Sequence, residues 1–62
     1  MKRHELIDHL KEQGCRLDRE GTRHMLYTNP HNGAKAPVPR HNEIDNRLVR
    51  RICRELGIEP VR

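Results

Sequence analysis

Two histidines stand where a strand is expected to meet a loop, and each has an arginine beside it. His24 follows Gly21-Thr22-Arg23 at the opening of one β-like segment, and His41 follows Arg40 at the close of the next. Imidazole titrates near neutral pH, so a histidine on an open strand face can take the proton of a ribose 2′-hydroxyl without a metal ion. The 2′-oxygen would then attack the adjacent phosphate. The pattern predicts cleavage of RNA but not of DNA, with His24 as the general base.

Both histidines also have a second interpretation. Arg40 could hold a phosphate while His41 donates a proton to the leaving 5′-oxygen, or His41 could be a turn residue that helps to cap the next helix. His24 could be a histidine without function, because five histidines in a chain of 62 residues cannot all be catalytic. Alternation along the strand sets His24 on one face and Met25 on the other, without showing which face is buried.

The other three histidines are expected to belong to the scaffold. His4 and His9 fall on the outer, acidic side of the first helix, and His31 falls in a turn. The histidines and cysteines lack the local spacing of zinc ligands, so no metal site is expected. The sequence has neither a glycine-rich phosphate loop nor an Asp-x-Asp pair, which argues against a nucleotide cofactor or a two-metal enzyme.

Positive charge is concentrated in the second part of the chain. Residues 1–20 carry five basic and five acidic side chains, whereas residues 21–62 carry eight basic and four acidic ones. Arginine outnumbers lysine by ten to three, and its planar guanidinium suits phosphate. A polyanionic partner is favoured, although a solvated basic surface or a protein partner would account for the same charge. The residues expected to contact RNA are Arg23, Lys35, Arg40, Arg47, Arg50, Arg51 and Arg54.

The spacing of apolar residues predicts two helices and three strands. The first helix covers residues 4–13, and the last begins after the capping residue Asp45 and stops at Gly57. The strands are expected at residues 15–19, 22–28 and 34–38, with a strong turn at 29–33. Leu17, in the first strand, is expected to point inward. The side of the last helix opposite its apolar residues carries the arginine stripe, namely Arg47, Arg50, Arg51 and Arg54.

This order of elements describes a small α+β domain, α-β-β-β-α, with a three-stranded antiparallel sheet and both helices on one sheet face. A chain of this length holds one domain, residues 1–62. Cys15 and Cys53 stand apart in the sequence and are expected to be reduced thiols. No segment has the apolar length of a membrane span or of a signal peptide, so a cytoplasmic protein is expected.

Several short motifs occur in an order and spacing that rarely arise by chance together. They are His4-Glu5-Leu6-Ile7-Asp8-His9-Leu10 ending at Gly14, Gly21-Thr22-Arg23-His24, the turn at Pro30 and Gly33, Val38-Pro39-Arg40-His41 with Glu43-Ile44, and Leu48-Val49-Arg50-Arg51-Ile52 running to Leu56-Gly57-Ile58. In this array the chain resembles the HicA-type toxins, also called YcfA-like proteins. These are the RNA-cleaving halves of toxin–antitoxin pairs, known as mRNA interferases.

The resemblance implies a fold like a double-stranded-RNA-binding domain and cleavage of mRNA by one histidine in the second strand, a position that falls on His24. It also implies a HicB-type antitoxin, which masks the active site and commonly also binds operator DNA, and no cofactor. Two alternatives stay open. One is a non-catalytic module of the same fold that grips duplex RNA through its shape, and the other is a small adaptor that binds only a protein partner.

Overall fold

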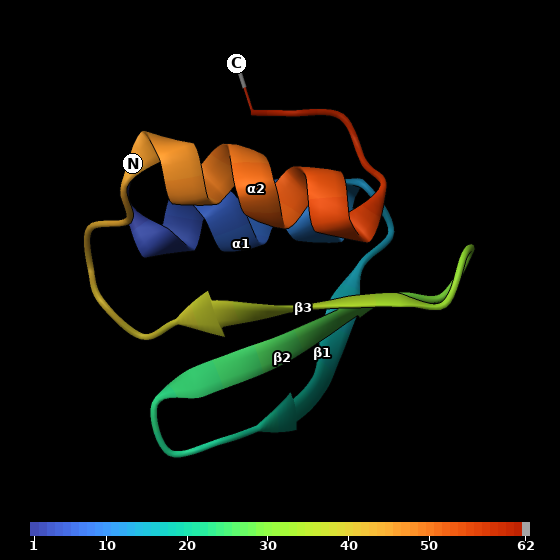
Figure 1. Ribbon diagram of the computed structural model, residues 1–62, viewed down its shortest axis with the longest axis horizontal. Coiled ribbons are helices and arrows are strands. Elements are labelled where there is room, and N and C mark those ends of the chain that lie inside the picture. The colour runs from blue at the N-terminus through green and yellow to red at the C-terminus, as the bar shows by residue number, and fades with distance from the viewer. Residues whose placement is uncertain (62) are drawn as a thin grey trace.

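Five elements follow one another in the predicted order. They are α1 (Arg3–Glu12), β1 (Arg16–Glu20), β2 (His24–Asn29), β3 (Ala34–Pro39) and α2 (Asn46–Leu56), in a computed structural model that describes residues 1–61. The strands pair antiparallel in the order β1-β2-β3, and both helices lie on the same side of the sheet (Figure 1). The predicted α+β architecture is therefore confirmed.

Both helices stop where the predicted glycines stand. Gly14 and Gly57 have φ angles of 86° and 68°, a left-handed conformation that glycine adopts without steric cost. At the start of α2, the side chain of Asp45 accepts a hydrogen bond from the backbone nitrogen of Arg47, 2.7 Å away. This bond satisfies one of the N–H groups that a helix leaves without an internal partner. Local signals in the sequence thus determine where α2 begins and ends.

The core lies between the helices and one face of β2 and β3. Met25 and Tyr27 are buried on this face, whereas His24 is exposed and Leu26 is half-buried. The sequence did not show which face of β2 is buried. The structure shows that Met25 and Tyr27 form the buried face and that His24 and Leu26 belong to the open face of the sheet. The other buried apolar residues are Leu6, Leu10, Cys15, Ala36, Val38, Ile44, Val49, Ile52, Cys53 and Leu56.

The two cysteines are core side chains with free thiols. Burial raises the pKa of both Cys15 and Cys53, and the nearby Cys53 raises that of Cys15 further. A thiol with a raised pKa stays protonated at neutral pH and is a weak nucleophile. Their contribution is therefore apolar packing rather than chemistry.

The expectation that Leu17 points into the core is wrong. Leu17 pairs with Tyr27 and so faces the helix side of the sheet, yet it is 41% exposed, and all five residues of β1 are exposed. Figure 1 shows why: β1 is an edge strand, and the β1–β2 hairpin extends beyond the layer of helices. Alternation predicted the correct face, but no helix covers that part of it.

A buried asparagine joins the β2–β3 turn to the end of α2. Asn29 is 4% exposed, and its Nδ2 donates a hydrogen bond to the carbonyl oxygen of Leu56 at 2.8 Å. Its Oδ1 accepts from the backbone nitrogen of His31 at 3.0 Å, and Nδ2 of Asn32 donates to the same Leu56 carbonyl at 3.1 Å. The last carbonyls of a helix have no partner within it, so this turn supplies the missing donors. The sequence predicted the turn but not its role in capping α2.

Candidate active site

One pocket brings the two predicted catalytic histidines together. It has a volume of about 290 Å³ and is lined by Thr22, Arg23, His24, Pro39, Arg40 and His41. The antiparallel register pairs His24, the first residue of β2, with Pro39, the last residue of β3. His41 comes two residues after Pro39, so the end of the strand pair carries both histidines. Both side chains are exposed, and neither lies in the apolar interior.

The turn that leads into His24 is fixed by two hydrogen bonds. The backbone nitrogen of Gly21 donates to the carbonyl oxygen of His24 at 2.8 Å, which closes the turn and makes β2 begin at His24 rather than at the predicted Thr22. A Cβ on residue 21 would lie 3.1 Å from that same oxygen, so a larger residue would crowd the histidine backbone. Nη2 of Arg40 donates to the carbonyl oxygen of Gly21 at 2.8 Å, which ties this turn to the loop after β3.

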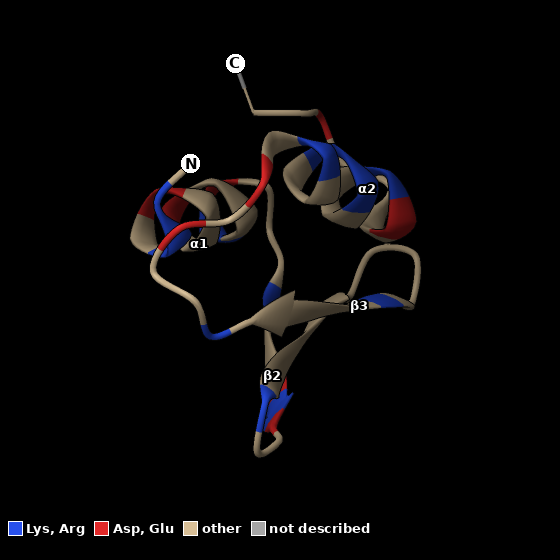
Figure 2. Ribbon diagram, turned by 60° about the vertical axis from the view of Figure 1, so that its left-hand side comes forward, with Lys and Arg blue, Asp and Glu red and all other residues tan. Residues whose placement is uncertain are grey.

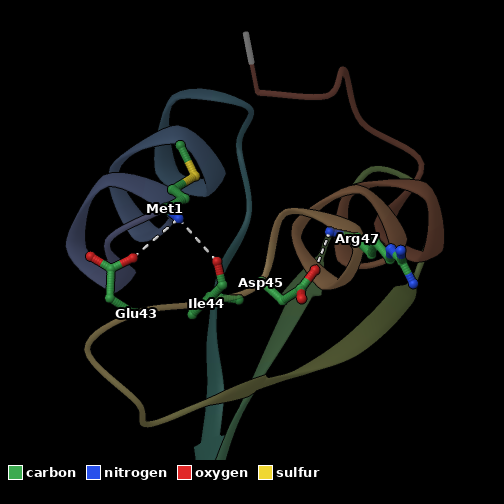
Figure 3. A network of polar contacts seen from close by, with 5 residues as sticks. All are labelled: Met1, Glu43, Ile44, Asp45 and Arg47. Carbon is green, nitrogen blue, oxygen red and sulfur yellow. Dashed lines mark hydrogen bonds and ion pairs between the residues drawn. The ribbon is translucent and has the colours of Figure 1, made fainter.

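The loop that carries His41 is held by the start of the chain. The backbone nitrogen of Arg3 donates to the carbonyl oxygen of Asn42 at 2.8 Å, and the guanidinium of Arg3 donates to the carbonyl oxygen of Arg40. The nitrogen of Ile44 donates to the carbonyl oxygen of Met1 at 2.8 Å, and the amine of Met1 lies 3.0 Å from the carbonyl oxygen of Ile44 (Figure 3). No local signal in the sequence predicts these contacts, because their partners are about 40 residues apart.

The electrostatic setting of the pocket is basic. Arg23 is exposed beside His24, and Arg40 keeps further N–H donors besides the one that it gives to Gly21. Among residues 1–61, the carboxylate that pairs with Arg40 is that of Glu20, with Oε1 4.0 Å from Nη2. Guanidinium groups in this position can attract a phosphate to the two imidazoles.

The remaining residues predicted to contact RNA lie elsewhere. Lys35, on β3, has its Nζ 3.2 Å from Oδ2 of Asp18. In the arginine stripe, Arg47 and Arg50 line a separate hollow with Met1 and Glu43, and the basic segments of α2 lie apart from the β1–β2 hairpin (Figure 2). The structure therefore gathers Arg23 and Arg40 around His24 and leaves the arginine stripe on another surface.

Residues 1–61 contain neither a group of metal ligands nor a membrane-spanning helix. No three histidine, cysteine or acidic side chains lie close enough to hold a metal ion. No helix in this part of the chain is long and apolar enough to cross a membrane.

The fold and the pocket define a small α+β domain of the kind that the resemblance implied, with exposed histidines at the end of its sheet. The chain belongs to the HicA toxin family: the profile of the family described as HicA toxin of bacterial toxin-antitoxin matches residues 3–58. Members of this family are known as mRNA interferases, and a toxin of such a system has an antitoxin partner. No curated protein and no solved structure matches the chain.

Proposed function

We propose that this protein is a metal-independent endoribonuclease that cleaves mRNA, with His24 as the general base. The observation that supports this proposal best is the exposed pocket in which His24 lies with His41, Arg23 and Arg40. In a member of the HicA toxin family, an accessible imidazole beside guanidinium groups is an arrangement suited to RNA cleavage, because it provides a general base next to phosphate-binding groups.

The proposed reaction uses only side chains of the pocket. His24 takes the proton of the ribose 2′-hydroxyl, the 2′-oxygen attacks the adjacent phosphorus, and the bond from phosphorus to the 5′-oxygen breaks. His41 donates a proton to that leaving oxygen. Arg23 and Arg40 stabilise the negative charge that develops on the phosphate oxygens. This stabilisation is strongest when the guanidinium groups are already in position before the reaction starts. The products are a 2′,3′-cyclic phosphate and a 5′-hydroxyl.

Replacing the 2′-hydroxyl next to the scissile phosphate with hydrogen is expected to abolish cleavage, because the attacking oxygen is then absent. The measurement compares a single-stranded RNA with the same strand carrying one 2′-deoxynucleotide at the mapped cleavage site, in the presence of a chelator. The unmodified strand should yield fragments that end in cyclic phosphate. Cleavage of the modified strand at that site would refute the mechanism. Intact RNA held in a duplex-specific complex would instead favour the non-catalytic RNA-binding module.

Replacing His41 with alanine separates its two interpretations. As the general acid, His41 donates a proton to the leaving oxygen, so the substitution should lower the cleavage rate by about 10²-fold or more. The measurement is single-turnover cleavage, with His41→Gln as the variant that preserves a polar turn residue but has no acidic group. A reaction slowed by alanine but not by glutamine would assign His41 to the loop structure alone.

The antitoxin is proposed to be a HicB-type protein that covers this pocket. The support is the family assignment together with the exposure of both histidines, which leaves the pocket open for a protein surface to close. Adding the antitoxin should stop cleavage and protect His24 and His41 from modification by diethyl pyrocarbonate. Inhibition without protection of these histidines would place the antitoxin elsewhere.

A further inference from the structure

The open face of the sheet presents basic side chains in line with the pocket. On β2, the residues His24, Leu26 and Thr28 alternate with the core residues Met25 and Tyr27 and so lie on the face away from the helices, where His24 is exposed and Thr28 is 8% exposed. Their register partners on β3 share that face. Those partners are Pro39 opposite His24, Pro37 opposite Leu26 and Lys35 opposite Thr28.

A β-bulge adds two arginines to this face. An unbroken strand would place Arg16 and Arg19 on opposite faces, because side chains alternate along a strand. The register of β1 shifts between Leu17 and Arg19, so Arg16 pairs with Thr28 and Arg19 pairs with Leu26. Both partners belong to the open face, and both arginines therefore do as well. Bulges commonly re-aim a side chain in this way beside functional sites.

The charge of this face is positive. The Arg19 side chain is 76% exposed, and Arg16 is exposed with no carboxylate of residues 1–61 within ion-pair distance. Asp18 also reaches this side, since its Oδ2 lies 3.2 Å from Nζ of Lys35 and 3.8 Å from Nε of Arg19. One carboxylate is thus shared by two cations, and Arg16 remains uncompensated.

We propose that the open face of the sheet is the track that binds single-stranded RNA next to the scissile phosphate, with Arg19 and Arg16 as phosphate contacts. This inference depends on the proposed function, which supplies RNA as the substrate. Arg16 and Arg19 pair with Thr28 and Leu26, which are two residues apart on β2, and residues two apart on a strand lie about 7 Å from each other. This step is comparable to that between successive phosphates of an extended strand. The cations of this face lie beyond His24 along β2, so a strand with its scissile phosphate in the pocket would pass over them.

The composition of the track indicates how it selects RNA. Its middle is formed by Leu26 and Pro37, and the one aromatic residue of the chain, Tyr27, points into the core. Without an aromatic platform for base stacking, the track grips phosphates rather than bases and tolerates many sequences. It also favours a single strand, because the 2′-oxygen must reach a position in line with the leaving oxygen, which a regular duplex does not permit.

The test compares the double variant Arg16→Ala and Arg19→Ala with the parent protein. Binding is measured with a labelled single-stranded RNA that carries a 2′-deoxynucleotide at the cleavage site, at several salt concentrations. The variant should bind more weakly, and the slope of log affinity against log salt should fall by about 1.4, since each phosphate contact to a single strand contributes about 0.7. The matched control, Lys2→Ala with Lys11→Ala, removes two basic side chains from the α1 end of the molecule and should leave the slope unchanged.

A second double variant, Arg16→Lys with Arg19→Lys, distinguishes lost charge from a damaged fold and should retain most of the slope. Parent-like RNA binding by the alanine variant, with binding lost instead on replacing Arg50 and Arg51 with alanine, would overturn the track and place RNA on the arginine stripe. Parent-like RNA binding with lost antitoxin binding would make this face a protein interface. A parent protein that binds RNA without cleaving it would refute the proposed function and leave the track in place, whereas a parent protein that does not bind RNA would refute both.

Discussion

Replacing His24 with alanine is expected to lower the rate of RNA cleavage by about 10²–10⁴-fold, the usual contribution of a positioned general base. The side chain is exposed at the start of β2 and is not one of the core residues, so the fold should not change. The measurement is single-turnover cleavage by purified protein, accompanied by growth of cells that express each variant. The alanine variant should not arrest growth.

The matched control is His4→Ala, which removes an exposed histidine of α1 that lies outside the pocket. It should cleave RNA at the rate of the parent. Circular dichroism spectra of both variants should coincide with that of the parent, which attributes a loss of rate to chemistry. An alanine variant at position 24 that cleaves as fast as the parent would show that another residue is the base.

Replacing Asn29 with alanine is expected to lower the free energy of unfolding by about 2 kcal/mol. The substitution removes the buried hydrogen bond to the Leu56 carbonyl and the hydrogen bond from the His31 nitrogen, and a typical hydrogen bond contributes about 0.5–1.5 kcal/mol. In a domain of this size each kcal/mol shifts Tm by about 4–8 °C, so Tm should fall by roughly 10 °C. Thermal unfolding followed by circular dichroism measures this change.

The control for this substitution is Asn42→Ala, which truncates an exposed asparagine whose backbone carbonyl, rather than its side chain, makes the contact with Arg3. Its Tm should lie within a few degrees of the parent value, because surface substitutions usually change stability by about 0.5 kcal/mol or less. Equal Tm values for the two variants would mean that the Asn29 side chain does not help to cap α2. In that case the end of the helix would be held by the Asn32 amide and by the backbone hydrogen bonds from Gly57 and Ile58.

The resemblance found in the sequence predicted the protein family as well as the fold. Its motifs predicted the HicA family, which the profile match over residues 3–58 confirms. The predicted roles of His24, His41 and the basic residues stay predictions, and the pocket makes them specific. It puts Arg23 and Arg40 near the proposed reaction and leaves the arginine stripe available for the antitoxin or for more distant RNA.

The sequence by itself determined the features that short-range interactions control, namely the two helices and the β2–β3 turn. The helical spacing of apolar residues, the Asp45 cap and the glycines after each helix predicted both helices to within a residue or two. The Asn-Pro and Asn-Gly steps predicted the β2–β3 turn for the same reason. These signals act over a few residues and need no tertiary partner.

Only the tertiary structure decided which surfaces are covered and which side chains meet. The alternation of side chains in β2 does not by itself show which face is buried, and this is decided by the helices that pack on the side of Met25 and Tyr27. Leu17 stays exposed because those helices do not extend over β1. The β1 bulge and the long-range bonds from Arg3 to the loop of His41 arise from pairing between distant segments. Burial and register are properties of the assembled sheet, and no local pattern in a single strand encodes them.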